Sequence, residues 1–252
     1  MNNYKSFTEL KGLTYQQVNG KLGLLIGSML LQQFITFFAS SFISALIPTN
    51  NIIGYLLNYI VLFILQILAF VLQSGLYFIH LQVACNISCS VSDLFEGFRS
   101  NTDKIIKISA ILAFISSICT IPSDIMYTKM LDLSTVEITT HSAFTAYYNS
   151  LMLYSLVSLA CMLLYFLVTL PFFPVFYMIW DYPDSNASKL LKRSIEVMKG
   201  NKCRYLLLQL SFVPSILLSF FICGVSLLWV IPLMNITSAN FYLDLISVQN
   251  KK

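Results

Sequence analysis

Long apolar segments without any charged residue dominate the pattern of this chain. No Lys, Arg, Asp or Glu occurs from Leu22 to Ser92, or from Tyr205 to Leu243. A helix needs about 20 apolar residues to cross the hydrocarbon core of a bilayer, and an uncharged run of 18 or more residues is typical of such a helix. The pattern therefore predicts an all-α integral membrane protein.

Turn-forming residues divide these segments into six predicted membrane-spanning helices. The turn from Pro48 to Asn51 separates the first two helices. Gly224 separates the last two, because a single helix from Tyr205 to Leu245 would be about 60 Å long. The predicted fold is a six-helix membrane bundle that forms one domain over residues 1–252, with spans at about 22–47, 52–80, 105–121, 151–180, 205–223 and 225–243.

Composition supports a membrane location. The chain is 57% hydrophobic and 10% charged, with a mean hydropathy of +0.76, whereas a soluble domain carries about 25% charged residues. Cytoplasmic loops of membrane proteins hold an excess of Lys and Arg. If the amino terminus is inside, six spans place fourteen of the fifteen Lys and Arg residues in the cytoplasm, and only Lys129 outside. Both termini are therefore predicted to be cytoplasmic.

The predicted cytoplasmic loops each contain a short amphipathic helix. Residues 93–99 can start with a capping box formed by Asp93 and Glu96. Residues 187–199 show apolar side chains at helical spacing, and Gly200 is a natural helix stop. Two positions for the second helix remain open: the inner membrane surface, or the protein's own inner face. The basic residues expected to contact anionic lipid head groups are Lys189, Lys192, Arg193 and Lys199.

Prolines interrupt three of the predicted spans. Each proline removes a backbone donor and clashes with the preceding turn, so carbonyl groups freed at membrane depth need protein partners or a water-filled cavity. A groove among the broken helices is the candidate binding region, and packing kinks without a ligand are the alternative. The residues assigned to this groove are Pro171, Pro174, Tyr177, Pro214, Trp229 and Pro232.

No residue is assigned to catalysis, a cofactor or a metal. The predicted spans hold no carboxylate in their central regions, and His80 is placed at the cytoplasmic edge of the second span. No catalytic-triad, zinc-protease or phosphate-loop motif occurs. The six cysteines are scattered, which favours free thiols, and Cys85 and Cys89 lack further residues to complete a metal site. The sequence predicts a protein that is not an enzyme.

The carboxy-terminal third contains residues whose order and spacing can be compared with a known family. They are Pro174, Tyr177, Asp181, Pro183, Ser194, Met198 to Asn201, Leu210 to Phe212, Gly224, Leu227 to Trp229, Pro232, Thr237, Phe241 and Tyr242. This series resembles the bacterial integral membrane proteins grouped as domain of unknown function 975, over about residues 170–245. The chain departs from the family at Pro214-Ser215 and at Leu233, where a Trp and a Tyr are usual. The resemblance implies a bacterial cell membrane location and no established activity.

The function that follows is a non-enzymatic, multi-pass membrane protein. Its expected partners are membrane lipids or another membrane protein, in envelope maintenance or as an accessory to an export or resistance system. The alternative is a transporter or lipid-handling protein that uses the groove among the proline-broken helices. Nucleic acid is not an expected partner.

Overall fold

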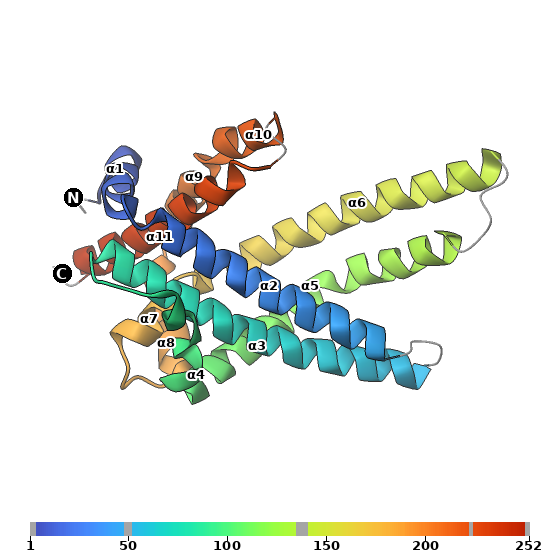
Figure 1. Cartoon of the computed structure of the whole chain (residues 1–252), viewed down its shortest axis with the longest axis horizontal. Coiled ribbons are helices and arrows are strands. Elements are labelled where there is room, and N and C mark those ends of the chain that lie inside the picture. Colours follow the sequence, from blue (N-terminus) through green and yellow to red (C-terminus); the bar gives the residue numbers. More distant parts are fainter. Residues whose placement is uncertain (1–3, 48–51, 135–140, 222–223, 250–252) are drawn as a thin grey trace. The chain divides into compact units, whose positions relative to one another are not determined.

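The computed structural model describes residues 4–47, 52–134, 141–221 and 224–249, and every regular element in these ranges is a helix (Figure 1). The all-α class is confirmed. The chain divides into two compact units, Met1–Ser109 with Pro171–Lys252, and Ala110–Leu170. The helices are α1 Phe7–Val18, α2 Leu22–Leu46, α3 Ile52–Ala84, η1 Val91–Phe95, α4 Glu96–Arg99, α5 Thr102–Ser134, α6 His141–Thr169, η2 Leu170–Phe172, α7 Val175–Asp181, α8 Ala187–Met198, α9 Lys202–Leu210, α10 Val213–Phe221 and α11 Leu227–Gln249.

Four helical stretches are long and apolar enough to cross a membrane. They expose large apolar side chains, such as Phe37 on α2 and Leu156 on α6, each 65% exposed. Such surfaces are stable where lipid or another apolar partner covers them. The stretches are Leu22–Leu46, Ile53–Ala84, Thr102–Leu131 and His141–Asp181.

The predicted spans 205–223 and 225–243 are not supported by the structure. The first is divided at Ser211 and Phe212 into α9 and α10, which have nine residues each. A helix of nine residues is about 14 Å long, too short for a hydrocarbon core of about 30 Å. The second lies within α11, whose residues are buried at most positions from Ile236 to Ile246. The helix α11 therefore forms the interior of the first unit, and six spans reduce to four candidates.

Three predicted helix ends also differ from the structure. The helix α3 continues to Ala84 rather than ending near residue 80. The helix α5 passes through Pro122 to Ser134, because one proline can be accommodated inside a long helix with a local distortion. The predicted span 151–180 begins earlier, at His141, and is interrupted from Leu170 onward as the prolines indicated.

The predicted amphipathic segments are both helical, although one cap is wrong. Residues 187–198 form α8, and Gly200 follows with a φ of +83°. Residues 93–99 are divided between η1 and α4. Asp93 does not pair with Glu96 there. Its carboxylate instead accepts a hydrogen bond from the backbone N–H of Ser90 at 2.8 Å, so the capping box begins three residues earlier.

A helix that the sequence analysis missed, α1, precedes the first span. Ser6 caps it: the Glu9 N–H donates to Ser6 Oγ at 3.2 Å, and the Ser6 N–H donates to Glu9 Oε2 at 2.7 Å. Ser-x-x-Glu is a capping-box pattern, so the signal was present in the sequence. Leu10 and Val18 are buried, and α1 packs against α11.

Close approach of backbones joins α3 to the η1–α4 segment. A side chain at Gly75 would overlap the Leu94 carbonyl group. A Cβ at Gly97 would lie 2.5 Å from Ser74 Oγ and 2.6 Å from the Val71 carbonyl oxygen. Both contacts need the absence of a side chain, so the two glycines determine how closely the segment packs on the helix.

Candidate functional site

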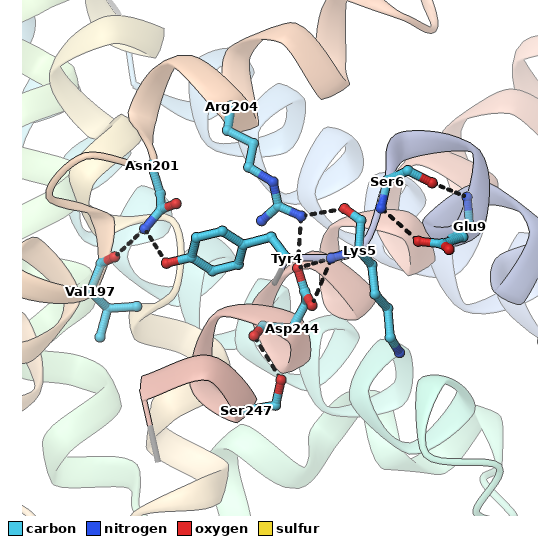
Figure 2. A network of polar contacts seen from close by, with 9 residues as sticks. All are labelled: Tyr4, Lys5, Ser6, Glu9, Val197, Asn201, Arg204, Asp244 and Ser247. Carbon is cyan, nitrogen blue, oxygen red and sulfur yellow. Dashed lines mark hydrogen bonds and ion pairs between the residues drawn. The ribbon is translucent and has the colours of Figure 1, made fainter. Parts of the chain in front are cut away.

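A buried ion pair joins α9 to α11 and holds the segment that precedes α1 (Figure 2). Arg204 Nη2 lies 2.7 Å from Asp244 Oδ2, and the two side chains are 17% and 3% exposed. The backbone N–H of Lys5 donates to both Asp244 carboxylate oxygens at 3.3 Å each. Arg204 Nη2 also donates to the Lys5 carbonyl oxygen at 2.7 Å. The carboxylate is therefore satisfied by one guanidinium and one backbone amide.

Aromatic side chains and an amide complete this network. The Arg204 guanidinium lies 4.5 Å from the ring centre of Tyr4 and 4.7 Å from that of Phe241. Such cation–π contacts partly compensate a cation for lost hydration. Asn201 Nδ2 donates to the Tyr4 hydroxyl at 3.2 Å and to the Val197 carbonyl oxygen at 3.3 Å (Figure 2). Tyr4 thus links the amino-terminal segment to the end of α8.

A second polar cluster connects α1, α11 and the end of α3. Asn240 Nδ2 donates to Gln17 Oε1 at 2.7 Å and to Thr14 Oγ1 at 3.1 Å. Gln17 Nε2 donates to the Ala84 carbonyl oxygen at 2.7 Å. The hydroxyls of Thr14 and Thr237 lie 3.1 Å apart. Because Thr14 and Asn240 are buried, these bonds fix the register of α1 on α11.

Lys11 of α1 caps the carboxy-terminal end of α9. Its Nζ donates to the Ser211 carbonyl oxygen at 3.0 Å and lies 4.2 Å from the ring centre of Phe212. Partial burial lowers the pKa of Lys11. A cation beside the last carbonyl groups of a helix is favoured by the helix dipole. The amino-terminal region is consequently attached to α9 as well as to α11.

The six residues assigned to a groove are not gathered around one opening. Tyr177 is fully buried, and its ring lies 4.8 Å from that of Tyr77 and 5.1 Å from that of Tyr242. A side chain with no exposed surface cannot line an open groove. Pro174 is also buried, as the residue before α7. The carbonyl oxygen of Pro171 accepts a hydrogen bond from Ser194 Oγ at 2.7 Å, so the helix break there is stabilised by α8.

The remaining groove residues lie elsewhere in the first unit. Pro214 is exposed in the first turn of α10, and Pro232 is buried inside α11. Trp229 is 46% exposed and lines a pocket of about 350 Å³ with Tyr15 and Asn19 of the amino-terminal region. The six residues are therefore distributed over η2, α7 with the residue before it, α10 and α11, and do not line a single groove.

The basic residues of α8 face away from its buried side. Lys189, Lys192 and Lys199 are exposed. Arg193 is half-buried: its Nη2 donates to the Tyr182 hydroxyl at 2.9 Å, and its guanidinium lies 4.0 Å from the centre of that ring. Three of these cations, Lys189, Lys192 and Arg193, line a pocket of about 480 Å³.

The buried side of α8 differs from the predicted one. Ile195 is one of the apolar residues at helical spacing in this segment, yet it is 42% exposed. Ser194 and Val197 take its place in the interior, beside Leu190 and Met198. The helix contacts α7 and α11. Packing on the protein's own face is therefore observed, and the cations stay available for other contacts.

His80 is buried inside the protein near the end of α3, and its Nδ1 has no hydrogen-bond partner among the described residues. It is 2% exposed on α3, one turn before Ala84, with its ring edge-on to Tyr77 at 6.2 Å. In the described ranges, no three His, Cys, Asp or Glu side chains lie close enough to hold a metal ion. Burial raises the pKa of the Cys85 and Cys89 thiols. Free thiols occur at Cys85, Cys89, Cys119, Cys161 and Cys203, and Cys223 lies outside the described residues.

The sequence analysis assigned no role to Arg204, Asp244, Thr14 or Asn240. A signal for the ion pair existed, because Arg204 and Asp244 are the charges that bound the uncharged run from Tyr205 to Leu243. Each lies twenty residues from Gly224, which has a φ of +77° in the turn before α11. A chain that folds back at Gly224 brings the two charges together.

Comparison of the whole chain with known proteins gives its family. Comparison with curated proteins and with solved structures found no match. The family described as "Protein of unknown function (DUF975)" matches residues 1–249. The resemblance that the carboxy-terminal third carries is confirmed, and the match also includes α1 to α6, where the sequence analysis found only a similar topology. The chain therefore belongs to the DUF975 family.

Proposed function

We propose that this chain is a non-enzymatic membrane protein that acts through contacts with lipids or with another membrane protein. One observation carries the proposal: the apolar surfaces of α2, α3, α5 and α6 are exposed, while two polar clusters of the first unit, around Arg204–Asp244 and around Asn240–Gln17, bind its helices to one another. Exposed apolar surface of this extent needs a covering of lipid or protein. Paired, buried polar groups serve to hold helices together.

The proposed topology has four spans with both termini in the cytoplasm of a bacterial cell. The helices α2, α3, α5 and α6 cross the membrane, and the same fourteen Lys and Arg residues stay on the inner side. The helices α1, α8, α9 and α11 then belong to a cytoplasmic bundle. In this arrangement the chain offers a basic inner surface, which suits an accessory role in the envelope or in an export system.

The absence of an enzymatic role is proposed from how the ionisable groups are used. Asp244 is bound by Arg204 and by Lys5, and Asp181 accepts a hydrogen bond from the Tyr242 hydroxyl at 2.5 Å. Such groups stabilise the fold. A general acid or base must instead be able to reach a substrate.

Membrane extraction tests the proposal. The full-length chain should remain with bacterial membranes after a wash with about 1 M salt, which screens surface charges. It should also remain after a wash with alkaline carbonate, and only detergent should release it. Release by either wash would contradict membrane spanning. Mass spectrometry of the detergent-purified protein should then reveal bound lipid or a second membrane protein. Purification of the chain as a lipid-free, partner-free protein that turns over a small molecule would contradict the proposed role.

A further inference from the structure

An apolar groove runs between α2 and α3, within the part of the chain that can cross a membrane. Its volume is about 530 Å³. Leu62 and Leu65 of α3 and Ile35 of α2 line its walls, and Phe95 and Phe98 of the η1–α4 segment lie at one end. The groove lies wholly within the first unit, whose helices α2 and α3 pack along each other (Figure 1).

Small side chains create this space. Ala39 on α2 and Ala69 on α3 line the groove, and larger side chains at these positions would occupy part of its volume. The polar residues of its wall are Gln33, Thr36, Ser40 and Gln66. Two of them bond within α2: Thr36 Oγ1 donates to the Gln32 carbonyl oxygen at 3.0 Å, and Ser40 Oγ donates to the Phe37 carbonyl oxygen at 3.0 Å. A hydroxyl bonded to its own helix presents mainly its carbon atoms to a neighbour.

The length and direction of the groove suit a linear apolar group. Its lining on α3 extends from Leu62 to Leu72, which is about 15 Å of helix. Beyond Leu72, Gln32 Nε2 donates to Gln73 Oε1 at 2.7 Å and joins the two helices. The groove therefore runs parallel to α2 and α3. It does not continue past Leu72 into the interior of the first unit.

A basic residue, Arg99, directly follows the groove-lining Phe98 in the sequence, in a segment that also carries Asp93 and Glu96. Phe98 is half exposed, and the next residue, Arg99, is exposed in the last turn of α4. The proposed topology puts this end of the groove at the cytoplasmic face of the membrane. Anionic head groups of the inner leaflet attract exposed cations at that depth by about 1 kcal/mol each.

We propose that the α2–α3 groove binds one acyl chain of an anionic phospholipid from the inner leaflet, with the head group at Arg99. The proposal rests on the proposed membrane function and specifies the lipid contact. A bound lipid of this kind differs from the lipids that surround any membrane protein, because its acyl chain occupies one groove and its head group meets one cation.

Cross-linking of the unaltered protein tests the position of the acyl chain. The full-length chain is placed in nanodiscs that contain a phosphatidylglycerol with a photoreactive acyl chain, and cross-linked peptides are mapped by mass spectrometry. Cross-links should concentrate on lining residues such as Ile35, Ala39, Leu62, Leu65 and Ala69, well above those at the exposed Ile53, Leu56 and Ile64 of α3. Cross-links spread evenly over the exposed apolar residues would indicate surrounding lipid only and overturn the proposal.

Two pairs of variants test the groove and the cation separately. Ala69→Phe fills the groove, and native mass spectrometry should show retained phospholipid reduced at least about tenfold (on the order of 1.4 kcal/mol). Ile64→Phe, an exposed position outside the groove, should retain it. Arg99→Gln should reduce the preference for phosphatidylglycerol over phosphatidylcholine, and Lys202→Gln on α9 should not. Equal retention in Ala69→Phe and the unaltered chain would overturn the proposal, as would an unchanged preference in Arg99→Gln.

The two proposals fail in different ways. If salt or carbonate releases the chain from membranes, the membrane function itself is wrong. If the chain stays in the membrane but its cross-links are evenly distributed, only the groove is wrong. Should Ala69→Phe fail to fold, the cross-linking map of the unaltered protein still decides between the two outcomes.

Discussion

Two glycines control how closely α3 and the η1–α4 segment pack. Gly75 lies on α3, and Gly97 lies on α4. Gly75→Ala should destabilise the protein by about 1–3 kcal/mol, because the new Cβ would overlap the Leu94 carbonyl group and η1 would have to move. The expected result is a lower thermal unfolding midpoint in detergent. Gly97→Ala should act in the same direction, since its Cβ would meet Ser74 and Val71.

A matched control exists on α2. Gly27 is also within a helix, yet a Cβ there would meet no atom within 4 Å. Gly27→Ala should leave the midpoint unchanged or raise it slightly, because alanine favours a helix by up to about 1 kcal/mol over glycine. A similar loss of stability in Gly27→Ala and Gly75→Ala would show that the close backbone contact is not the cause.

The ion pair beneath the amino-terminal segment gives a second prediction at this scale. Asp244→Asn should cost about 3 kcal/mol, because it leaves the partly buried Arg204 without its counter-charge. It also weakens the acceptor for the Lys5 amide. Chemical denaturation in detergent measures the loss, and limited proteolysis should cut the chain before α1 faster than in the unaltered protein.

The double variant separates the charge from the contacts. Arg204→Gln with Asp244→Asn should lose less stability than the sum of the single variants, because a neutral pair leaves no unpaired charge. Asp184→Asn, at an exposed position, should have no measurable effect. Simple additivity in the double variant would show that the two groups do not depend on each other.

At the scale of whole elements, sequence patterns predicted where helices form but not which side of each helix is buried. The ends of α8 and the stop at Gly200 follow from local rules, namely apolar spacing and a positive φ. Which side of α8 is buried depends on α7 and α11, which is why Ser194 is inside and Ile195 is outside. The helix α1 was missed because its buried face is mixed: Leu10 and Val18 are apolar, but Thr14 and Gln17 on the same side hydrogen-bond to Asn240 and interrupt the apolar pattern.

The separated α8 segment should bind anionic membranes. A peptide of residues 187–198 should gain helicity on vesicles that contain phosphatidylglycerol, and added salt should weaken its binding. In the peptide the side that the protein buries is free, while Lys189, Lys192 and Arg193 supply the attraction. A peptide with these three cations changed to Gln is the control. Equal helicity of the basic peptide on neutral vesicles would contradict a role for its charges.

For the whole molecule, the sequence correctly indicated an all-α fold with several helices apolar enough to cross a membrane, and it counted six such helices where the structure has four candidates. Hydropathy alone cannot distinguish a helix covered by lipid from one covered by protein, and α11 illustrates this. Ile236 is buried against residues of α1, α2 and α3, and Phe241 is buried beside Phe173 and Tyr205. The Lys and Arg test did not detect the difference, because the run from Tyr205 to Leu243 contains no charge to assign to either side.

The two arrangements, with four spans and with six, differ in the side of the membrane on which Gly224 lies. Six spans place the turn between α10 and α11 outside the cell, whereas four spans place it in the cytoplasm. The four-span arrangement follows from two nine-residue helices that are too short to cross, and from α11 with Asp244 buried beside Arg204. A reporter that is active only outside the cytoplasm, inserted after Gly224 in the full-length chain, should be inactive.

Two further insertions calibrate this measurement. The reporter should be active after Ser142, near the start of α6, and inactive after Lys199, in either arrangement. A reporter that is active after both Ser142 and Gly224, and inactive after Lys199, would restore six spans. In that arrangement the Arg204–Asp244 ion pair would join the last two spans at their cytoplasmic ends. Silence after both Gly224 and Lys199, with activity after Ser142, would place α9, α10 and α11 in a cytoplasmic bundle that α1 joins to the membrane-spanning helices.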